Sequence, residues 1–277
     1  YKVNPGIWAI SKQMGGLVLK PSEFSQDRIL DSFVHTKHIE DKVDSFFNRL
    51  HVYAQFGIEV PRRSILLWGP AGTGKTASLQ KIATKYSKES DVAVIIWKTD
   101  VIDPYEVKEF VKRFEYIGVQ RLIVIAEDIG GVEIDQVRIK SESSLLSLLD
   151  NQEKAFKIPV MIIATTNYPE NLLANLTNRP QRIDDKIEVG YPDAKQRKAL
   201  FRFFAGERKL KKFLYEMIAS KPYSNFTPSH IKEVFVRAAI YDISLRKSMI
   251  QIREEIEKFN NLFQNKIKLG IAVKTSN

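Results

Sequence analysis

Hydrophobic and polar positions follow one arrangement before about residue 193 and another after it. In the first part, short and nearly continuous apolar runs, typical of strands buried on both faces, alternate with segments of helical period. The strand-like runs are Ser64–Trp68, Val92–Lys98, Arg121–Ala126, Val160–Thr165 and Lys186–Val189, and the helix-like segments are His38–Phe56, Thr76–Tyr86, Pro104–Tyr116 and Glu142–Lys154. The pattern predicts an α/β fold in which a parallel sheet is sandwiched by helices.

After residue 193 only helical patterns remain. Ala194–Gly206 and Lys209–Ser220 predict two helices, and Thr227-Pro228 predicts the start of a third, with a cap residue followed by proline. From Leu245 to Phe263 apolar residues recur at spacings of three and four, which predicts a last helix with an apolar seam. This part is expected to form a small all-helical domain.

The first 34 residues follow neither the strand pattern nor the helical pattern over a long stretch. Short apolar pieces are separated by Pro5-Gly6 and Gly15-Gly16. We interpret residues 1–34 as an N-terminal arm or small hairpin. The α/β domain then covers residues 35–192 and the helical domain residues 193–277.

A glycine-rich segment joins the strand-like run Ser64–Trp68 to the helix-like run after it. It fits the pattern G-x-x-x-x-G-K-[ST], with Gly69, Pro70, Ala71, Gly72, Thr73, Gly74, Lys75 and Thr76, followed by Ala77. Its glycines let backbone N–H groups turn toward a polyphosphate, Lys75 would reach the β- and γ-phosphates, and the Thr76 hydroxyl would bind Mg²⁺. The alternative is a glycine-rich turn that binds nothing. The segment predicts a P-loop NTPase that binds ATP and Mg²⁺.

Two carboxylates, Glu127 and Asp128, follow the apolar run that begins at Arg121. A strand ending in two acids suits a P-loop protein, because one acid can bind Mg²⁺ and the next can polarise the attacking water. The register that keeps four apolar residues directly before the pair assigns the metal to Glu127 and the water to Asp128. The alternative is two solvated acids at a strand end.

Together these segments resemble an AAA+ ATPase of the AAA subgroup, over roughly residues 35–240. Ile163–Asn167 resembles the family's fourth core strand, which ends in a polar sensor residue, and the resemblance implies that Asn167 orients the water near the γ-phosphate. Asn178–Asp184 resembles the family's R-P-G-R-F/V-D segment, with Gln181 in place of glycine. The resemblance implies that Arg179 and Arg182 are arginine fingers.

An arginine finger stabilises the charge that phosphoryl transfer spreads over the γ-phosphate oxygens. In this family the finger reaches the site of the neighbouring subunit, which implies a homo-oligomeric ring, expected to be a hexamer. The alternative for Arg179 and Arg182 is an ordinary surface ion pair.

The segment Val189–Asp193 resembles the link into the family's helical lid domain, and Thr227–Ile231 falls where a lid helix approaches the nucleotide. His230 would either stack near the adenine or merely cover the lid. No sensor 2 arginine is evident, since Arg237 fits a surface position. The T-P-x-x segment and the Glu-Asp order are similar to the branch of the mitochondrial complex III assembly ATPase.

The family's substrate-gripping pore loop is poorly matched. The corresponding stretch Lys98–Tyr105 lacks the usual glycine, and Tyr105, its only aromatic residue, is expected to pack at a helix start. Gly130-Gly131 and the residues up to Lys140, including Arg138, resemble a second pore loop, although an ordinary solvent loop explains them nearly as well.

The composition limits partners and location. The net charge is +10, with basic residues scattered rather than clustered, so a solvated basic surface is favoured over a nucleic-acid site. The absence of cysteine fits a reducing compartment, and we expect a cytoplasmic protein. No apolar run is long enough to span a membrane, and four scattered histidines do not predict a zinc site. Because the first residue is Tyr, we expect the sequence to begin inside a longer chain.

These observations predict a ring-forming ATPase that couples Mg-ATP hydrolysis to the remodelling or assembly of a protein substrate. One alternative is a DNA-associated loader or motor built on the same kind of ATPase domain, which the positive charge would favour. The other is a nucleotide-gated scaffold with slow turnover.

Overall fold

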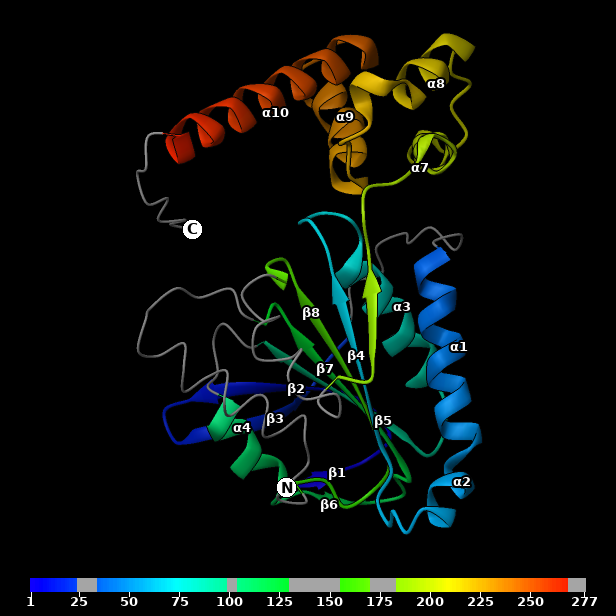
Figure 1. Cartoon of the computed structure of the whole chain (residues 1–277), viewed down its shortest axis with the longest axis vertical. Coiled ribbons are helices and arrows are strands. Elements are labelled where there is room, and N and C mark those ends of the chain that lie inside the picture. Colours follow the sequence, from blue (N-terminus) through cyan, green and yellow to red (C-terminus); the bar gives the residue numbers. More distant parts are fainter. Residues whose placement is uncertain (24–33, 99–103, 130–154, 170–182, 269–277) are drawn as a thin grey trace. The chain divides into compact units, whose positions relative to one another are not determined.

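The computed structural model describes residues 1–23, 34–98, 104–129, 155–169 and 183–268. The chain divides into two compact units (Figure 1). Unit 1 comprises Tyr1–Ala71 and Lys75–Gly190, and unit 2 comprises Gly72–Gly74 and Tyr191–Asn277. Each unit is described by itself below.

Unit 1 is built on a seven-stranded sheet with the order β3-β2-β5-β7-β8-β4-β9. The strands are β2 (Gly6–Gln13), β3 (Gly16–Pro21), β4 (Arg62–Trp68), β5 (Val92–Lys98), β7 (Arg121–Glu127), β8 (Val160–Thr166) and β9 (Asp185–Glu188). All neighbouring strands run parallel except β2 and β3. The helices in the described part of this unit are α1 (Val34–Asn48), α2 (Leu50–Gln55), α3 (Lys75–Tyr86) and α4 (Pro104–Val111). The predicted α/β fold with a largely parallel sheet is confirmed.

Both faces of the sheet are buried, because side chains along each strand alternate between two hydrophobic cores. On β7, for example, Ile123 and Ile125 pack with residues of α1 and α3, whereas Leu122 and Val124 pack with residues of α4. Helices therefore cover both faces (Figure 1). This burial on two sides explains why the strands appear in the sequence as continuous apolar runs.

The first residues form a β-hairpin that extends the sheet. Strand β2 pairs antiparallel with β3 through a turn at Met14 and Gly15, and parallel with β5. The sequence predicts an arm or small hairpin here, without a clear strand pattern. The pattern is weak because most of the hairpin is half-buried or exposed, so that few of its positions need to be apolar.

Two predicted helices differ from the structure. The predicted helix over His38–Phe56 is interrupted at Arg49, whose backbone leaves helical geometry between α1 and α2. The predicted helix over Pro104–Tyr116 ends at Val111, and Glu115–Tyr116 form the short strand β6, which pairs with β1 (Lys2–Val3). Pairing with a segment more than a hundred residues away overrides the local helical pattern. The predicted helix Glu142–Lys154 lies outside the described residues.

Unit 2 is helical, as predicted, and contains α7 (Ala194–Ala205), α8 (Lys212–Ala219), the short 3₁₀ helix η1 (Lys221–Tyr223), α9 (Pro228–Ile240) and α10 (Leu245–Lys268). Asp193 caps α7 and Thr227 caps α9, each through a reciprocal capping box. Arg197 is buried and donates hydrogen bonds to the carbonyl oxygens of Pro192, Ile218 and Ala219, which ties the ends of α7 and α8 together. Across the described part of the chain, no helix combines the length and apolar character that a membrane span requires.

Candidate nucleotide-binding site

The glycine-rich segment lies between β4 and α3, as the sequence predicts. Gly69, Gly72 and Gly74 all have positive φ angles, of 148°, 76° and 103°. Side chains with a Cβ atom rarely adopt these angles, so the glycines are needed for the shape of the loop. The loop turns from the carboxyl end of β4, an inner strand next to the edge strand β9, directly into the amino-terminal end of α3, where the helix dipole favours an anion.

The position of Gly69 is also restricted by its neighbour Val189. A Cβ atom at Gly69 would lie 2.3 Å from the carbonyl oxygen of Val189. The Val189 N–H donates a hydrogen bond of 2.8 Å to the carbonyl oxygen of Trp68, which fixes this approach. The end of β9 thus supports the start of the loop, a contact that motif reasoning does not identify.

Lys75, the first residue of α3, points back into the loop. Its side chain is buried, and its ammonium group donates hydrogen bonds to the carbonyl oxygens of Gly69 (2.7 Å) and Pro70 (2.9 Å). Burial lowers the pKa of Lys75 from 10.5 to about 8, and the negative charge of Asp128 opposes this effect. The lysine is therefore held where the negative charge of an incoming polyphosphate would raise its pKa again.

The other loop residues differ in exposure. Thr73 is buried, Pro70, Gly74 and Ala77 are half-buried, and Ala71, Gly72 and Thr76 are exposed. Within unit 2, the Gly72 carbonyl oxygen accepts hydrogen bonds from Ser229, 3.3 Å from its hydroxyl and 3.4 Å from its N–H group. The sequence reasoning did not identify Ser229, which carries no signal beyond its place near the start of α9.

The two carboxylates lie at the carboxyl end of β7. Glu127 is the last residue of that strand and is half-buried, while Asp128 is exposed and has a φ of 56°. Aspartate is one of the few residues that tolerate this left-handed conformation. The backbone leaves strand geometry at Asp128. The two carboxylates therefore do not follow the regular alternation of side chains along β7.

Asp128 is held by two residues from the end of β8. Its N–H group donates a hydrogen bond of 3.0 Å to the hydroxyl of Thr165, and its Oδ1 accepts one of 3.2 Å from the side-chain amide of Asn167. The structure therefore brings together Asp128 and Asn167, two residues that the sequence assigns to the same chemistry. Thr165 was missed as a site residue, because a buried threonine at the end of a strand has no distinctive motif.

The residues present fit a magnesium ion bound with a triphosphate. Thr76 offers an exposed hydroxyl group at the first turn of α3, and Glu127 offers a carboxylate at the end of β7. Within the described ranges no group of three His, Asp, Glu or Cys side chains forms a metal cage. That arrangement suits Mg²⁺, which is usually bound by one or two protein ligands together with phosphates and water.

His230 has a structural role on α9. Its Nδ1 accepts a hydrogen bond of 3.1 Å from the Thr227 N–H, as the third residue of the capping box. Its ring also packs against Phe226, and burial lowers its pKa. One ring nitrogen is thus engaged within unit 2, and a role at the adenine stays a prediction.

Other predicted residues have different outcomes. Arg179 and Arg182 lie outside the described residues, as do Arg138, Lys140 and the predicted second pore loop. Arg237 forms ion pairs with Glu233 and Glu255, which fits the predicted surface role. The expectation that Tyr105 packs is wrong, since this residue is 59% exposed. It lies on the side of α4 opposite the buried Val107, Phe110 and Val111.

Comparisons with known proteins agree with this geometry. The model of the ATPase family associated with various cellular activities (AAA) matches residues 65–191. A proteasome-activating nucleotidase of Saccharolobus solfataricus is 23% identical, over 96% of this chain and 74% of its own length. The ATPase family gene 2 protein of Schizosaccharomyces pombe is 27% identical, over 76% of this chain and 27% of its own length. The 26S proteasome regulatory subunit 7 of Caenorhabditis elegans is 25% identical, over 79% of this chain and 52% of its own length.

The matched residues contain the glycine-rich loop, both carboxylates and Asn167, and they end at Tyr191, where unit 2 resumes. The resemblance to the branch of the mitochondrial complex III assembly ATPase stays a prediction. Motif, geometry and family match agree on one conclusion: residues 65–191 form an ATPase domain of the AAA family, and the chain is an enzyme that hydrolyses ATP.

Proposed function

We propose that this protein forms a ring, with six subunits as the expected number, and uses ATP hydrolysis to remodel or assemble a protein substrate. The ATP would lie against the loop from Gly69 to Thr76, with Lys75 at its β- and γ-phosphates. The Thr76 hydroxyl and the Glu127 carboxylate would hold Mg²⁺, which supplies charge stabilisation for the γ-phosphate.

In this proposal Asp128 and Asn167 hold the attacking water. The Asp128 carboxylate accepts a proton or hydrogen bond from the water, and the Asn167 amide keeps that carboxylate oriented through the contact at 3.2 Å. Thr165 fixes the backbone from which Asp128 projects. Arg179 and Arg182 would complete the site of the neighbouring subunit and stabilise the charge on the transferred phosphoryl group.

The observation that carries the proposal is the convergence of Lys75, Asp128 and Asn167. They come from three different segments and meet at the carboxyl ends of adjacent parallel strands, where ligands bind in open α/β sheets. The charge of Asp128 acts on Lys75, and the amide of Asn167 contacts Asp128. If the glycine-rich loop served only as a turn and bound no nucleotide, these three side chains would not need to lie close together.

Support for a protein substrate comes from the names of two similar proteins, a proteasome-activating nucleotidase and a proteasome regulatory subunit. Support for a ring comes from the predicted fingers, because an arginine that serves a neighbour's nucleotide requires a head-to-tail interface.

The test is complementation between two inactive variants. Lys75→Ala removes the phosphate contact of its own site, and Arg182→Ala removes the finger offered to a neighbour. Each variant alone should be inactive, whereas mixtures should regain ATPase activity, because some interfaces join an intact loop to an intact finger. An unfolded protein should also stimulate the wild-type ATPase. No recovery at any mixing ratio, in mixtures shown to co-assemble, would contradict the proposed geometry.

A second candidate is a DNA-associated loader or motor, which the net charge of +10 favours. DNA binding would then weaken steeply with salt, since each phosphate contact releases counterions. A flat salt dependence, or stimulation by unfolded protein alone, would favour the first function.

A further inference from the structure

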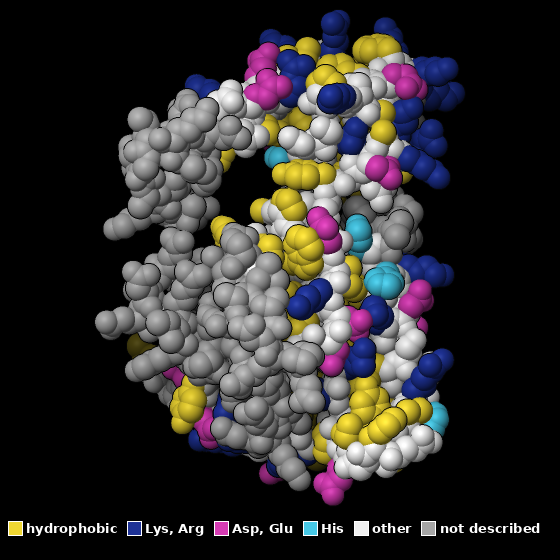
Figure 2. Space-filling model, in the orientation of Figure 1, with side chains coloured by type: hydrophobic (Ala, Val, Ile, Leu, Met, Phe, Trp, Pro, Cys, Tyr) yellow, Lys and Arg dark blue, Asp and Glu magenta, His cyan; other side chains and the backbone are white. Residues whose placement is uncertain are grey.

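The positive charge of the chain is concentrated in one short stretch of unit 2. Residues 194–219, which form α7, α8 and the turn between them, contain eight lysine and arginine residues but only two acidic ones. This stretch therefore carries +6 of the net charge of +10. In Figure 2 Lys and Arg side chains gather over the part of unit 2 where Figure 1 shows these two helices. The expectation that the basic residues are scattered is wrong for this region.

Half of these cations lie in the turn and at the start of α8, in residues 206–213, which we call the basic turn. Glu207 is its single acidic residue, and its four exposed cations are Arg208, Lys209, Lys211 and Lys212. Two backbone hydrogen bonds define its shape, from the Arg208 N–H to the Ala205 carbonyl oxygen (3.2 Å) and from the Leu214 N–H to the Lys211 carbonyl oxygen (3.0 Å). A fixed backbone therefore presents the four cations to the solvent.

The cations of the basic turn have few acidic neighbours. The first three of the four form no ion pair with any described residue. Lys212 acts on the carboxylate of Glu216, but that carboxylate already pairs with Lys198 at 2.9 Å. The turn therefore carries positive charge that the described part of the protein does not neutralise.

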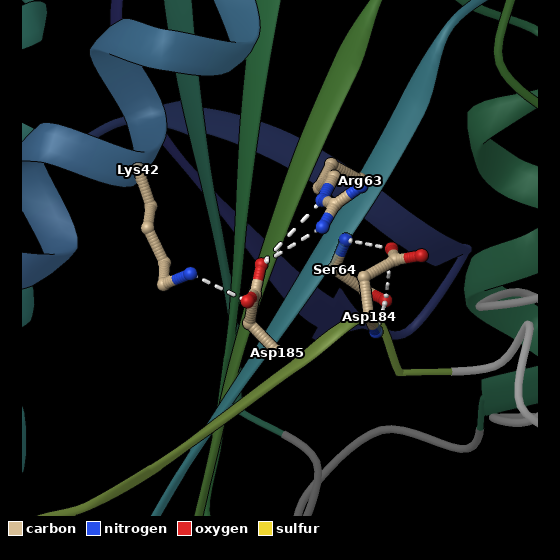
Figure 3. A network of polar contacts seen from close by, with 5 residues as sticks. All are labelled: Lys42, Arg63, Ser64, Asp184 and Asp185. Carbon is tan, nitrogen blue, oxygen red and sulfur yellow. Dashed lines mark hydrogen bonds and ion pairs between the residues drawn. The ribbon is translucent and has the colours of Figure 1, made fainter.

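Several cations elsewhere in the described structure do have acidic partners. In unit 1, Lys42 and Arg63 share the carboxylate of Asp185 (Figure 3). In unit 2, Arg237 on α9 pairs with two glutamates. The basic turn differs from these sites, because its cations outnumber its one carboxylate by four to one.

Two of the lysines also occupy an unfavourable position at the start of α8. Lys211 precedes this helix and Lys212 is its first residue, and the first turn of the helix contains no acidic residue. The amino-terminal end of a helix carries a partial positive charge, so cations placed there are destabilising. A negatively charged ligand at the basic turn would offset this effect, because the lysines and the helix end both attract it.

An aromatic side chain stands beside the cations. Phe213 follows Lys212 directly and is 49% exposed. Within residues 194–219, all of which the structure describes, it is the only large apolar side chain that is exposed. On α7, one helical turn before the basic turn, the exposed guanidinium of Arg202 lies 5.7 Å from the centre of the Tyr215 ring. Arg202 thus adds a fifth cation at this end of the helix pair.

We propose that the basic turn binds single-stranded nucleic acid, with its cations on the backbone phosphates and Phe213 stacked on a base. Proteins that hold single strands without reading their sequence combine cations that follow the phosphates with aromatic rings that stack on bases. The site uses none of the residues assigned to ATP. It would give the second candidate function its DNA contact, and it applies equally to an enzyme that acts on proteins bound to nucleic acid.

The chemistry of the basic turn favours a nucleic acid over other polyanions. Each nucleotide supplies a phosphate and an aromatic base together, so one ligand satisfies both the cations and the exposed ring. An acidic peptide would supply charge alone at most of its positions. An anionic membrane surface is bound by an apolar helix face as well as by cations, and one exposed phenylalanine does not make such a face.

The test measures binding of short fluorescent oligothymidine and oligouridine strands to the full chain, without ATP, at several salt concentrations. Each phosphate contact of a single strand contributes about −0.7 to the logarithmic salt slope. Four contacts therefore predict a slope of about −3, which corresponds to a loss of affinity of roughly 50-fold between 50 and 200 mM salt.

Removing two of the lysines should weaken binding and flatten its salt dependence. The double variant Lys209→Gln and Lys211→Gln should lower affinity at low salt at least about tenfold and should about halve the slope. The matched control is Lys20→Gln with Lys88→Gln, which makes the same change in net charge on exposed lysines of unit 1. Its affinity and slope should stay close to those of the wild type.

Phe213 is tested separately from the charge. Phe213→Leu should weaken binding at least about fivefold without changing the salt slope, because the ring stacks on a base and contacts no phosphate. Phe213→Tyr keeps the ring and should bind like the wild type. Basal ATPase activity should be unchanged in all these variants, which shows that they fold. Undiminished binding by Phe213→Leu would overturn the stacking assignment.

Two further results would overturn the proposal as a whole. If the lysine variant and its control lose equal affinity, the net charge of the chain and not the basic turn binds the strand. If phosphatidylserine vesicles or polyglutamate bind the wild type more tightly than the oligonucleotides do, the ligand is a different polyanion. Neither result bears on the proposed ring, because the complementation between Lys75→Ala and Arg182→Ala involves no nucleic acid.

Discussion

The side-chain amide of Asn167 donates a hydrogen bond of 3.2 Å to the carboxylate of Asp128. These two residues directly follow the neighbouring strands β8 and β7, and they are 39 positions apart in the sequence. Because the strands run parallel, their carboxyl ends lie at the same edge of the sheet, and the hydrogen bond joins the two residues there.

Replacing Asp128 by asparagine should separate ATP binding from hydrolysis. Asparagine tolerates the left-handed backbone at this position (φ 56°), so the fold should be kept, while the negative charge that polarises water is lost. We expect ATP affinity to change less than about threefold and turnover to fall by at least about a hundredfold. The measurements are equilibrium nucleotide binding and steady-state phosphate release. Normal turnover in Asp128→Asn, together with its loss in Glu127→Gln, would show that the two carboxylates have the opposite roles.

Replacing Thr165 by valine should lower turnover without removing nucleotide binding. The substitution deletes the hydroxyl that accepts the Asp128 N–H, and it costs about 1–3 kcal/mol of stability if that group is left unpaired. Thr165→Ser, which keeps the hydroxyl, is the matched control and should stay close to wild type in turnover. Loss of turnover in Thr165→Ser but not in Thr165→Val would mean that the packing of the methyl group, not the hydrogen bond, is what matters.

The central sheet was predictable from the sequence, and the details of the site were not. The inner strands β4, β5, β7 and β8 are buried on both faces, so each appears as a nearly continuous apolar run. The hairpin before residue 22 is half-buried and gives no such signal. The glycine-rich loop was predictable because its chemistry requires a fixed spacing of residues.

The supporting contacts of the site depend on three-dimensional proximity. Val189 approaches Gly69 from a strand 120 residues further along, and Thr165 meets Asp128 across a strand pair. Neither residue type is unusual at the end of a strand. The helix expected over Glu115–Tyr116 was wrong for the same reason, because pairing with β1 decides the structure there.

The buried ammonium of Lys75 predicts a pH dependence of ATP binding. Its pKa of about 8 in the free protein should rise when phosphates approach, because their negative charge favours the protonated form. ATP binding should therefore take up a proton above pH 8, and affinity should fall with rising pH by at most about tenfold per pH unit. Below pH 7 the lysine is already protonated, and uptake by this group should vanish.

Calorimetry at pH 9 in two buffers of different ionisation enthalpy measures this proton uptake directly. Lys75→Arg is the control, because its guanidinium stays protonated throughout the range. If that variant still binds ATP, it should show no uptake. The absence of uptake in the wild type at pH 9 would contradict the assignment of Lys75 to the phosphates.

Replacing Gly69 by alanine should damage the loop more than replacing nearby Gly190. At Gly69 the new Cβ would lie 2.3 Å from the Val189 carbonyl oxygen, and the φ of 148° is unfavourable for alanine. We expect at least about 1–3 kcal/mol of destabilisation from strain, with weakened ATP binding. At Gly190 the Cβ meets only the Glu188 carboxylate, at 3.6 Å. Chemical denaturation and ATP titration of both variants measure the difference, and equal stability would mean that the end of β9 does not restrict the loop.

The two possible roles of His230 can be separated by substituting glutamine. Glutamine at the third helical position can accept the Thr227 N–H through its side chain, so His230→Gln should keep the capping box that starts α9. His230→Ala loses that acceptor and should cost about 1 kcal/mol of stability. If the imidazole only caps the helix, His230→Gln binds ATP as tightly as the wild type. If ATP affinity falls in His230→Gln while its thermal stability is unchanged, the ring also contacts the nucleotide, because capping alone cannot produce that combination.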